Sequence, residues 1–142
     1  MALEKQRIQV LVVDDHAGMR DGISAMVNTQ ADMSVAGEAS NGRRAIEQFR
    51  TLKPDVTIID WNLPIIPGDE VIATLIKEFP QARFIAITAP NDDTCIRRTQ
   101  DLGAKGYIHK DMLRRELLPA IRAVHQGQQH FPEKPGQPEE ER

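Results

Sequence analysis

The sequence predicts a single α/β domain, doubly wound around a parallel β-sheet with helices on both faces. The chain has 142 residues, enough for one domain with a substantial core. It contains short, uninterrupted apolar runs, which are typical of strands buried on both faces. These runs alternate with segments of helical periodicity. Strands and helices in this order need right-handed crossovers, and these produce a parallel sheet.

Five segments are predicted as strands, each followed by a helix. Four strands end on polar residues, and the second, which is less apolar, precedes an Asn-Gly turn. The predicted strands are Ile8–Val13, about Ser34–Ala39, Val56–Ile59, Phe84–Ile87 and Tyr107–His109.

The five predicted helices have recognisable ends. Lys53-Pro54 ends the second, Pro80 follows the third, and Gly103 closes the fourth. Asp111 is predicted to cap the fifth. The helices are expected at about His16–Asn28, Arg43–Leu52, Asp69–Phe79, from near Asp92 to Gly103, and from Asp111 to Val124.

Composition limits the classes of function. A net charge of -3 gives no general attraction to nucleic acids. Cys95 is the only cysteine, which excludes an internal disulfide and fits a reducing compartment. No apolar run approaches the roughly 18 residues of a membrane span, and the N-terminus lacks the apolar block of a secretory signal. We therefore expect a cytoplasmic domain that does not contact membranes.

The chain divides into three parts. Residues 1–7 are predicted to be an N-terminal extension, and residues 8–126 the folded domain. Beyond Gln126 the sequence is rich in proline, glycine and charge, with too little apolar material to offset the entropy of ordering. Residues 127–142 are therefore predicted to form a flexible linker or tail.

Polar groups at four strand ends should converge on one edge of the sheet. In a parallel sheet the C-terminal ends of the strands share an edge, and ligands bind there. The groups at these ends are those of Asp14, Asp15, Asp60, Thr88 and Lys110. Singly, each has a structural explanation, since an Asp after a strand is often a helix cap and a Lys is usually a surface charge. Their joint occurrence at one edge favours a functional pocket.

The chemistry of this pocket points to a divalent cation. Three neighbouring carboxylates repel one another unless a cation or proton intervenes. Oxygen-only ligands favour Mg²⁺, or Mn²⁺, over zinc. Asp15 and Asp60 are the predicted direct ligands. Asp14 would bind directly or through water, and the backbone carbonyl of Asn62 could complete the set. His16, beside the acid pair, is expected only to open the first helix.

A carboxylate beside such a cation can attack phosphorus and form an aspartyl-phosphate. Lys110 would stabilise the charge of the transferred group, and Thr88 would donate a hydrogen bond to one of its oxygens. The small side chain of Ala89 leaves room for the phosphoryl group.

The chain resembles the receiver domain of two-component response regulators from about Ile8 to Val124. The resemblance implies the flavodoxin-like strand order 2-1-3-4-5. It is carried by the motifs Val12-Val13-Asp14-Asp15-His16, Ile59-Asp60-Trp61-Asn62-Leu63-Pro64 with Gly68, Ile87-Thr88-Ala89 and Gly103-Ala104-Lys105-Gly106-Tyr107-Ile108-His109-Lys110.

The resemblance also implies roles for six residues and a phosphoryl donor, a phosphohistidine on a sensor histidine kinase or a phosphotransfer domain. These roles are Asp60 as phosphoacceptor, Asp14 and Asp15 as metal-site acids, Thr88 as switch hydroxyl, Tyr107 as switch aromatic and Lys110 as the invariant lysine. Phosphorylation would draw Thr88 toward the phosphoryl group and let Tyr107 turn inward. The surface formed by the fourth helix, fifth strand and fifth helix would then change its preferred partner.

Two segments, 35–42 and 120–127, are similar to the NarL/FixJ subclass, whose members usually continue into a helix-turn-helix DNA-binding domain. We expect a transcriptional regulator that contacts DNA only through an output domain absent from this chain. It could also form a phosphorylation-dependent homodimer. The alternative is a free-standing receiver that acts by protein contacts or as a phosphorelay intermediate.

Two helices depart from the family pattern. The fourth is poor in apolar residues, with Ile96 and Leu102 as its main anchors. The fifth contains Pro119, which removes a backbone hydrogen bond and costs about 3 kcal/mol in a helix interior. We predict a kink or irregular turn near Arg115–Pro119.

Three other classes of protein fit less well, and we expect a phosphoacceptor switch rather than a turnover enzyme. A haloacid-dehalogenase phosphatase needs an Asp two residues after its nucleophile, where Asp60 is followed by Asn62. A flavin-binding electron carrier needs a Ser/Thr-rich phosphate cradle, and Asp14-Asp15 would repel the flavin phosphate. A phosphorylation-independent binding module would not need the complete set of acids, hydroxyl and amine.

Overall fold

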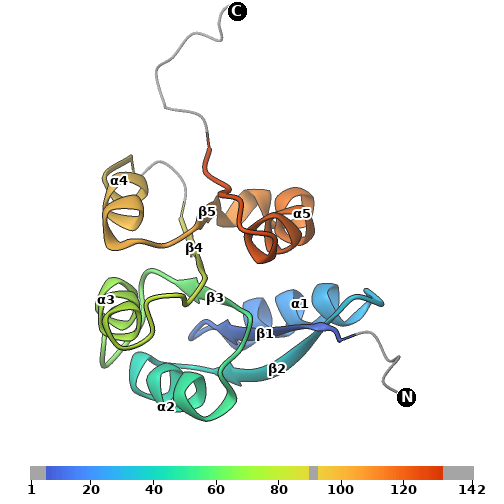
Figure 1. Cartoon of the computed structure of the whole chain (residues 1–142), viewed down its shortest axis with the longest axis horizontal. Coiled ribbons are helices and arrows are strands. Elements are labelled where there is room, and N and C mark those ends of the chain that lie inside the picture. The colour runs from blue at the N-terminus through green and yellow to red at the C-terminus, as the bar shows by residue number, and fades with distance from the viewer. Residues whose placement is uncertain (1–5, 90–92, 133–142) are drawn as a thin grey trace, which may run out of the picture.

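The computed structural model describes residues 6–89 and 93–132 (Figure 1). It contains a five-stranded parallel sheet in the order β2-β1-β3-β4-β5, which confirms the predicted fold class. The strands are β1 (Ile8–Val13), β2 (Met33–Ala39), β3 (Val56–Asp60), β4 (Phe84–Thr88) and β5 (Gly106–His109). The helices are α1 (Ala17–Asn28), α2 (Gly42–Leu52), α3 (Gly68–Glu78), α4 (Asp93–Leu102), the short 3₁₀ helix η1 (Lys110–Met112) and α5 (Leu113–His125).

The helices form two layers around the sheet. On one face α1 and α5 pack against alternate residues of the strands, including Val10, Val12 and Ile58. On the other face α2 and α3 cover the residues between them, such as Leu11 and Val13. The helix α4 lies beside α3 and covers the end of the sheet near β5 (Figure 1). Both faces of the central strands are therefore buried, as their uninterrupted apolar runs predict.

The fourth helix is anchored by more residues than the sequence suggested. Its predicted start near Asp92 lies outside the described residues. Ile96 is buried as expected, and Cys95 and Thr99 are buried as well. The Thr99 hydroxyl donates to the Cys95 carbonyl at 2.6 Å, which allows a polar side chain to face the interior. Gly103 ends the helix with a φ of 96°, a left-handed conformation that glycine adopts easily.

Two predictions for the fifth helix are wrong. Asp111 does not cap it, because the chain first forms η1 and Met112 takes the position before α5. Of the kink or irregular turn predicted near Arg115–Pro119, the irregular turn is absent, because one α-helix continues through Pro119. Pro119 and Arg115 are both exposed, so water can solvate the carbonyl that loses its helical partner.

The chain beyond α5 folds back onto the sheet. Gly127, with a φ of 90°, turns the chain, and His130 forms a parallel bridge with Gly106 of β5. The bridge consists of two backbone hydrogen bonds of 2.9 Å, from Tyr107 N to His130 O and from His130 N to Lys105 O. The first residues of the predicted flexible tail thus lie on the folded domain. Residues 133–142 lie outside the described residues.

A close backbone contact fixes α3 against the end of β3. A β-carbon added to Gly68 would overlap the Asp60 carbonyl oxygen and come within 2.9 Å of Trp61. The Gly68 amide also donates to the Trp61 carbonyl at 3.0 Å. Glycine therefore lets α3 begin directly beside Asp60.

We expect Gly68→Ala to lower the free energy of unfolding by about 1–3 kcal/mol, because backbone on both sides must move apart. Urea denaturation would measure this. Gly22→Ala is the matched control: nothing lies within 4 Å of its added carbon, so it should stabilise α1 by about 0.5–1 kcal/mol. Equal effects of the two substitutions would show that the contact at Gly68 is unimportant.

Candidate functional site

Two aspartates are buried side by side at the C-terminal edge of the sheet. Asp14 directly follows β1 and Asp60 is the last residue of β3, and these strands are neighbours. The side chains of Asp14 and Asp60 are 0% and 1% exposed. Burying two carboxylates is costly unless they are paired with positive charge, so a cation is expected close to both.

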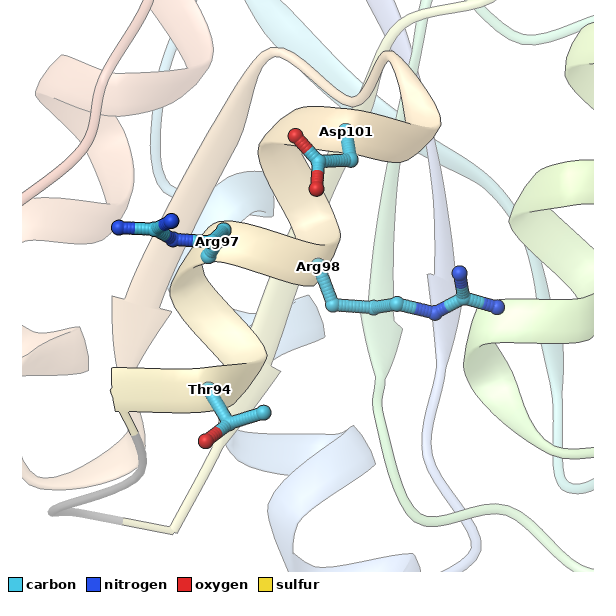
Figure 2. Close-up of a pocket in the computed structure, with 4 residues that line it drawn as sticks. All are labelled: Thr94, Arg97, Arg98 and Asp101. Carbon is cyan, nitrogen blue, oxygen red and sulfur yellow. The ribbon is translucent and has the colours of Figure 1, made fainter.

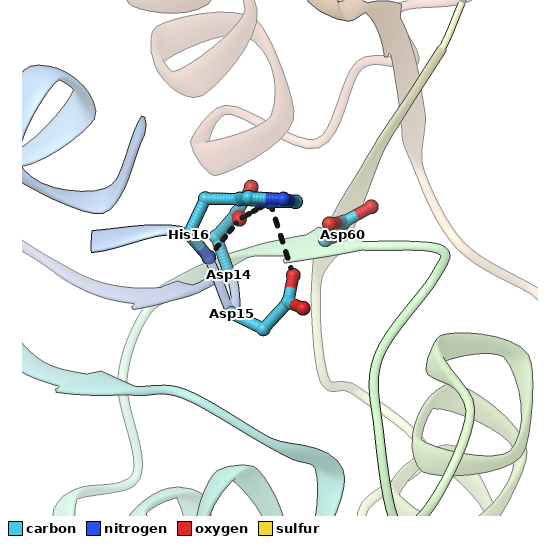
Figure 3. A group of neighbouring side chains, drawn as sticks. All are labelled: Asp14, Asp15, His16 and Asp60. Atoms are coloured by element: carbon cyan, nitrogen blue, oxygen red, sulfur yellow. Dashed lines mark hydrogen bonds and ion pairs between the residues drawn. The ribbon is translucent and has the colours of Figure 1, made fainter. Parts of the chain in front are cut away.

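A partly exposed acid and a histidine complete this cluster. One ligand atom each from Asp14, Asp15, His16 and Asp60 can be chosen so that all lie within 4.8 Å of one another (Figure 3). The Asp14 Oδ2 atom is buried and accepts no hydrogen bond from the described residues. A buried carboxylate oxygen that accepts no hydrogen bond fits a site that a divalent cation completes.

Lys110 brings a positive charge to the two buried acids. Its Nζ donates to Asp60 Oδ2 at 3.0 Å and lies 3.5 Å from Asp14 Oδ2. The residue follows β5 and begins η1, so the turn at the strand end aims its side chain back over the edge. The other Asp60 oxygen, Oδ1, accepts a 3.0 Å hydrogen bond from the Asn62 backbone amide.

The environment shifts the protonation equilibria of both partners. Burial raises the pKa of Asp60 above its ordinary 3.8, and the hydrogen bonds from Asn62 and Lys110 only partly offset this, while the charge of Asp14 raises it further. Burial lowers the pKa of Lys110, but Asp60 and Asp14 outweigh that and raise it above 10.5. The two directions are compatible, because the buried Asp60 faces another acid whereas the partly exposed Lys110 faces two acids.

The raised pKa of Asp60 predicts a pH effect on stability in metal-free solution. Because the folded state holds the Asp60 proton more tightly than the unfolded state, this contribution is full below pH 3.8 and is lost as pH rises through the folded-state pKa. Urea denaturation in a chelator should show wild type losing stability relative to Asp60→Asn over that interval. A constant difference between the two proteins across it would contradict the prediction.

His16 does more than open the first helix. It occupies the predicted position before α1, and its backbone amide donates to Asp14 Oδ1 at 2.8 Å. In addition, its Nδ1 lies 3.3 Å from Asp14 Oδ1 and 3.2 Å from Asp15 Oδ1 (Figure 3). The one signal of these contacts in the sequence is that His16 is adjacent to the acids, and adjacency does not determine the direction of a side chain.

The other predicted site residues lie around the same edge. Thr88, the last residue of β4, is buried, and Ala89 after it is exposed. Asn62 is exposed in the loop after β3. Tyr107 of β5 is fully buried in a cluster with residues of β4 and α4. All the predicted residues therefore belong to strand ends or adjoining turns of one sheet edge, with Tyr107 beneath it.

A separate hollow lies on the surface of α4. Thr94, Arg97, Arg98 and Asp101 line it (Figure 2). Arg97 and Arg98 extend from the helix in different directions, and the Arg98 guanidinium lies 3.6 Å from the Asp69 carboxylate of α3. The hollow combines groups from one exposed helix face, without buried acids. The acidic sheet edge is accordingly the better candidate site.

Comparisons with known proteins agree with this fold. The model of the response regulator receiver domain family matches residues 10–122. The chain is 36% identical over 124 residues to the response regulator GacA of Pseudomonas viridiflava, and 34% identical over 124 residues to the response regulator protein VraR of Staphylococcus aureus. These alignments include 87% of this chain but only 58% and 59% of the relatives.

A solved structure supports the same assignment. The signal receiver domain of the response regulator NarL from Mycobacterium tuberculosis superposes with a TM-score of 0.81 at 27% identity, covering 87% of this chain and 99% of that one. In the described part of this chain, no helix has the length and apolarity needed to cross a bilayer.

Proposed function

The chain belongs to the response regulator receiver family of two-component systems, and we propose that Asp60 is its phosphoacceptor. The observation that carries this proposal is the environment of the Asp60 carboxylate. It is buried at a strand end and clustered with Asp14 and Asp15. One of its oxygens accepts a hydrogen bond from Lys110 and the other from the Asn62 backbone amide. That arrangement presents a carboxylate oxygen to an incoming phosphoryl group and supplies compensating charge.

The donor in the cell would be a phosphohistidine of a sensor histidine kinase or a phosphotransfer domain. An ionised Asp60 oxygen forms a bond to phosphorus while the bond from phosphorus to the imidazole nitrogen breaks, and the departing imidazole keeps that electron pair and is protonated. Lys110 donates a hydrogen bond to the oxygen on which negative charge develops. Thr88, at the adjoining end of β4, donates a hydrogen bond to the phosphoryl group. Ala89 next to it leaves space for that group.

Receiver domains generally bind Mg²⁺ at an acidic pocket, and the acids of this chain fit one. Asp14, Asp15 and Asp60 would hold the ion, together with the backbone carbonyl of Asn62, and Mn²⁺ would suit the same oxygens. The bound cation would neutralise charge on the carboxylates and on the phosphoryl oxygens.

The consequence of phosphorylation would be a change at the surface of α4, β5 and α5, transmitted by Thr88 and Tyr107. We expected Tyr107 to turn inward on phosphorylation. In the structure it is already fully buried, so the change would begin from a buried ring. The phosphoryl group would bias an equilibrium between two packed arrangements rather than draw in an exposed side chain.

The biological output would be transcription. The chain spans less than two thirds of the length of GacA and VraR. The proposed output module is a helix-turn-helix domain outside this sequence. The whole protein would be a cytoplasmic regulator that dimerises when phosphorylated. The second candidate is a free-standing receiver, which would act on a partner protein or pass the phosphoryl group onward.

The proposal is tested by labelling the purified chain with acetyl phosphate. With Mg²⁺ present, we expect one phosphoryl group per chain by intact mass and a labile acyl-phosphate bond; with the metal chelated, we expect none, because the repelling acids then lack their cation. Metal-independent labelling, or modification at a residue other than Asp60, would contradict it. Rapid sustained hydrolysis of a phosphomonoester would indicate a phosphatase instead.

A further inference from the structure

The segment that folds back after α5 covers the region of Tyr107. Four contacts anchor its residues Gln128–Phe131. Gln128 N donates to the Ala123 carbonyl of α5 at 2.9 Å, and His130 bridges β5 through two backbone bonds. The His130 ring lies 3.0 Å from the Glu116 carboxylate of α5. Phe131 packs against the buried cluster of Ala86, Cys95, Ile96 and Tyr107.

These contacts join the segment to the surface through which the receiver is proposed to signal. Its partners lie on β5 and α5, and the cluster under Phe131 includes residues of α4. Figure 1 shows the last described residues, after α5, beside β5. Gly106 leaves room for this approach, since an added β-carbon would make tight contacts, 3.1 Å from Ile85 Cγ1 and 3.3 Å from the His130 carbonyl oxygen. The last described residues are therefore part of the packing around Tyr107.

The docking is also weak enough to be reversible. A single bridged residue supplies the pairing with β5, and the ion pair is partly exposed, with side chains 26% and 30% accessible. Phe131 itself is only partly buried. Segments with few buried contacts and few hydrogen bonds open at low free-energy cost. A modest shift of the cluster under Phe131 is thus sufficient to change the fraction of molecules in which the segment is docked.

We propose that Gln128–Phe131 is a docking strand, with Phe131 and His130 as positioning residues for Tyr107, and that phosphorylation releases it. This rests on the proposed function. When Thr88 moves toward the phosphoryl group, Tyr107 follows into the vacated space and withdraws from the cluster surface on which Phe131 packs. By linkage, the docked strand opposes binding of the phosphoryl group as strongly as that group opposes docking.

Hydrogen exchange tests the release directly. The Tyr107 and His130 amides form the bridge to the docking strand, so their exchange should accelerate when beryllofluoride and Mg²⁺, which imitate the phosphoryl group, are added. The Lys53 amide, bonded to the Phe49 carbonyl at the distant end of α2, is the control and should not change. Unchanged or slower exchange at the two bridge amides would overturn the proposal.

Reciprocity gives a second readout, the affinity for beryllofluoride. Trp61, the only tryptophan, follows Asp60 and packs against the Tyr107 cluster, so its fluorescence can report binding. Phe131→Ala should bind beryllofluoride about fivefold more tightly or better, and Glu116→Gln should shift in the same direction. Phe79→Ala, which removes a partly buried ring beside Phe49, is the matched control and should bind like wild type.

The outcomes separate the two proposals. If wild type binds beryllofluoride and Asp60→Asn does not, the proposed function stands; wild-type affinity in both Phe131→Ala and Glu116→Gln then overturns the docking strand alone. If wild type does not bind beryllofluoride and is not labelled by acetyl phosphate, the proposed function fails, and the coupling fails with it.

Discussion

Asp60→Asn should abolish phosphorylation by acetyl phosphate in Mg²⁺ while leaving the protein folded. The amide keeps the shape of the carboxylate but is not a nucleophile toward phosphorus, so no acyl phosphate forms. Stability should not fall, because burial already disfavours the charged form of Asp60 and the neighbouring Asp14 repels it. Intact-mass measurement of labelling and urea denaturation in a chelator would test both statements.

A matched control separates loss of the nucleophile from loss of an acid in general. Asp101→Asn removes an exposed carboxylate from α4, away from the acidic edge, and should be labelled like wild type. Labelling of Asp60→Asn at the wild-type rate would mean that another residue accepts the phosphoryl group. An unfolded Asp60→Asn protein would show instead that the carboxylate is required structurally.

Lys110→Met should reduce both the rate of labelling and the stability. Methionine retains much of the apolar stem but removes the ammonium, which lies 3.0 Å from Asp60 Oδ2 and 3.5 Å from Asp14 Oδ2. Removing one donor of this kind costs about 100-fold in rate. Two buried carboxylates then lose their nearby cation, and because Lys110 is partly exposed we expect a stability loss of about 1–3 kcal/mol without metal.

Added Mg²⁺ should restore part of the stability of Lys110→Met, because the cation offsets the same two carboxylates, but should not restore the labelling rate. Lys77→Met, an exposed substitution in the last turn of α3, is the control for losing a lysine. Chemical denaturation with and without Mg²⁺, together with initial labelling rates, measures the effects. A labelling rate equal to that of Lys77→Met would remove Lys110 from the proposed reaction.

Much of the candidate site could be predicted because its signals are local in sequence. A buried strand appears as a continuous apolar run, and the residue that ends it must lie at the sheet edge. Asp14, Asp60, Thr88 and Lys110 each follow such a run, so the parallel topology alone brings them together. The prediction for residues 115–119 failed because propensity describes an isolated helix. The cost of Pro119 is tolerated where the packed face of α5 holds the helix in place.

The sequence by itself determined the order of strands and helices, the family, and which polar groups share one edge, since these follow from the spacing of apolar residues and from short motifs. Only the tertiary structure decided that the His16 ring turns toward Asp14 and Asp15, that Tyr107 is fully buried, and that the chain after Gly127 returns to β5. Each of these depends on contacts between residues brought together by folding. A single bridge or a rotamer leaves no periodic pattern along the chain.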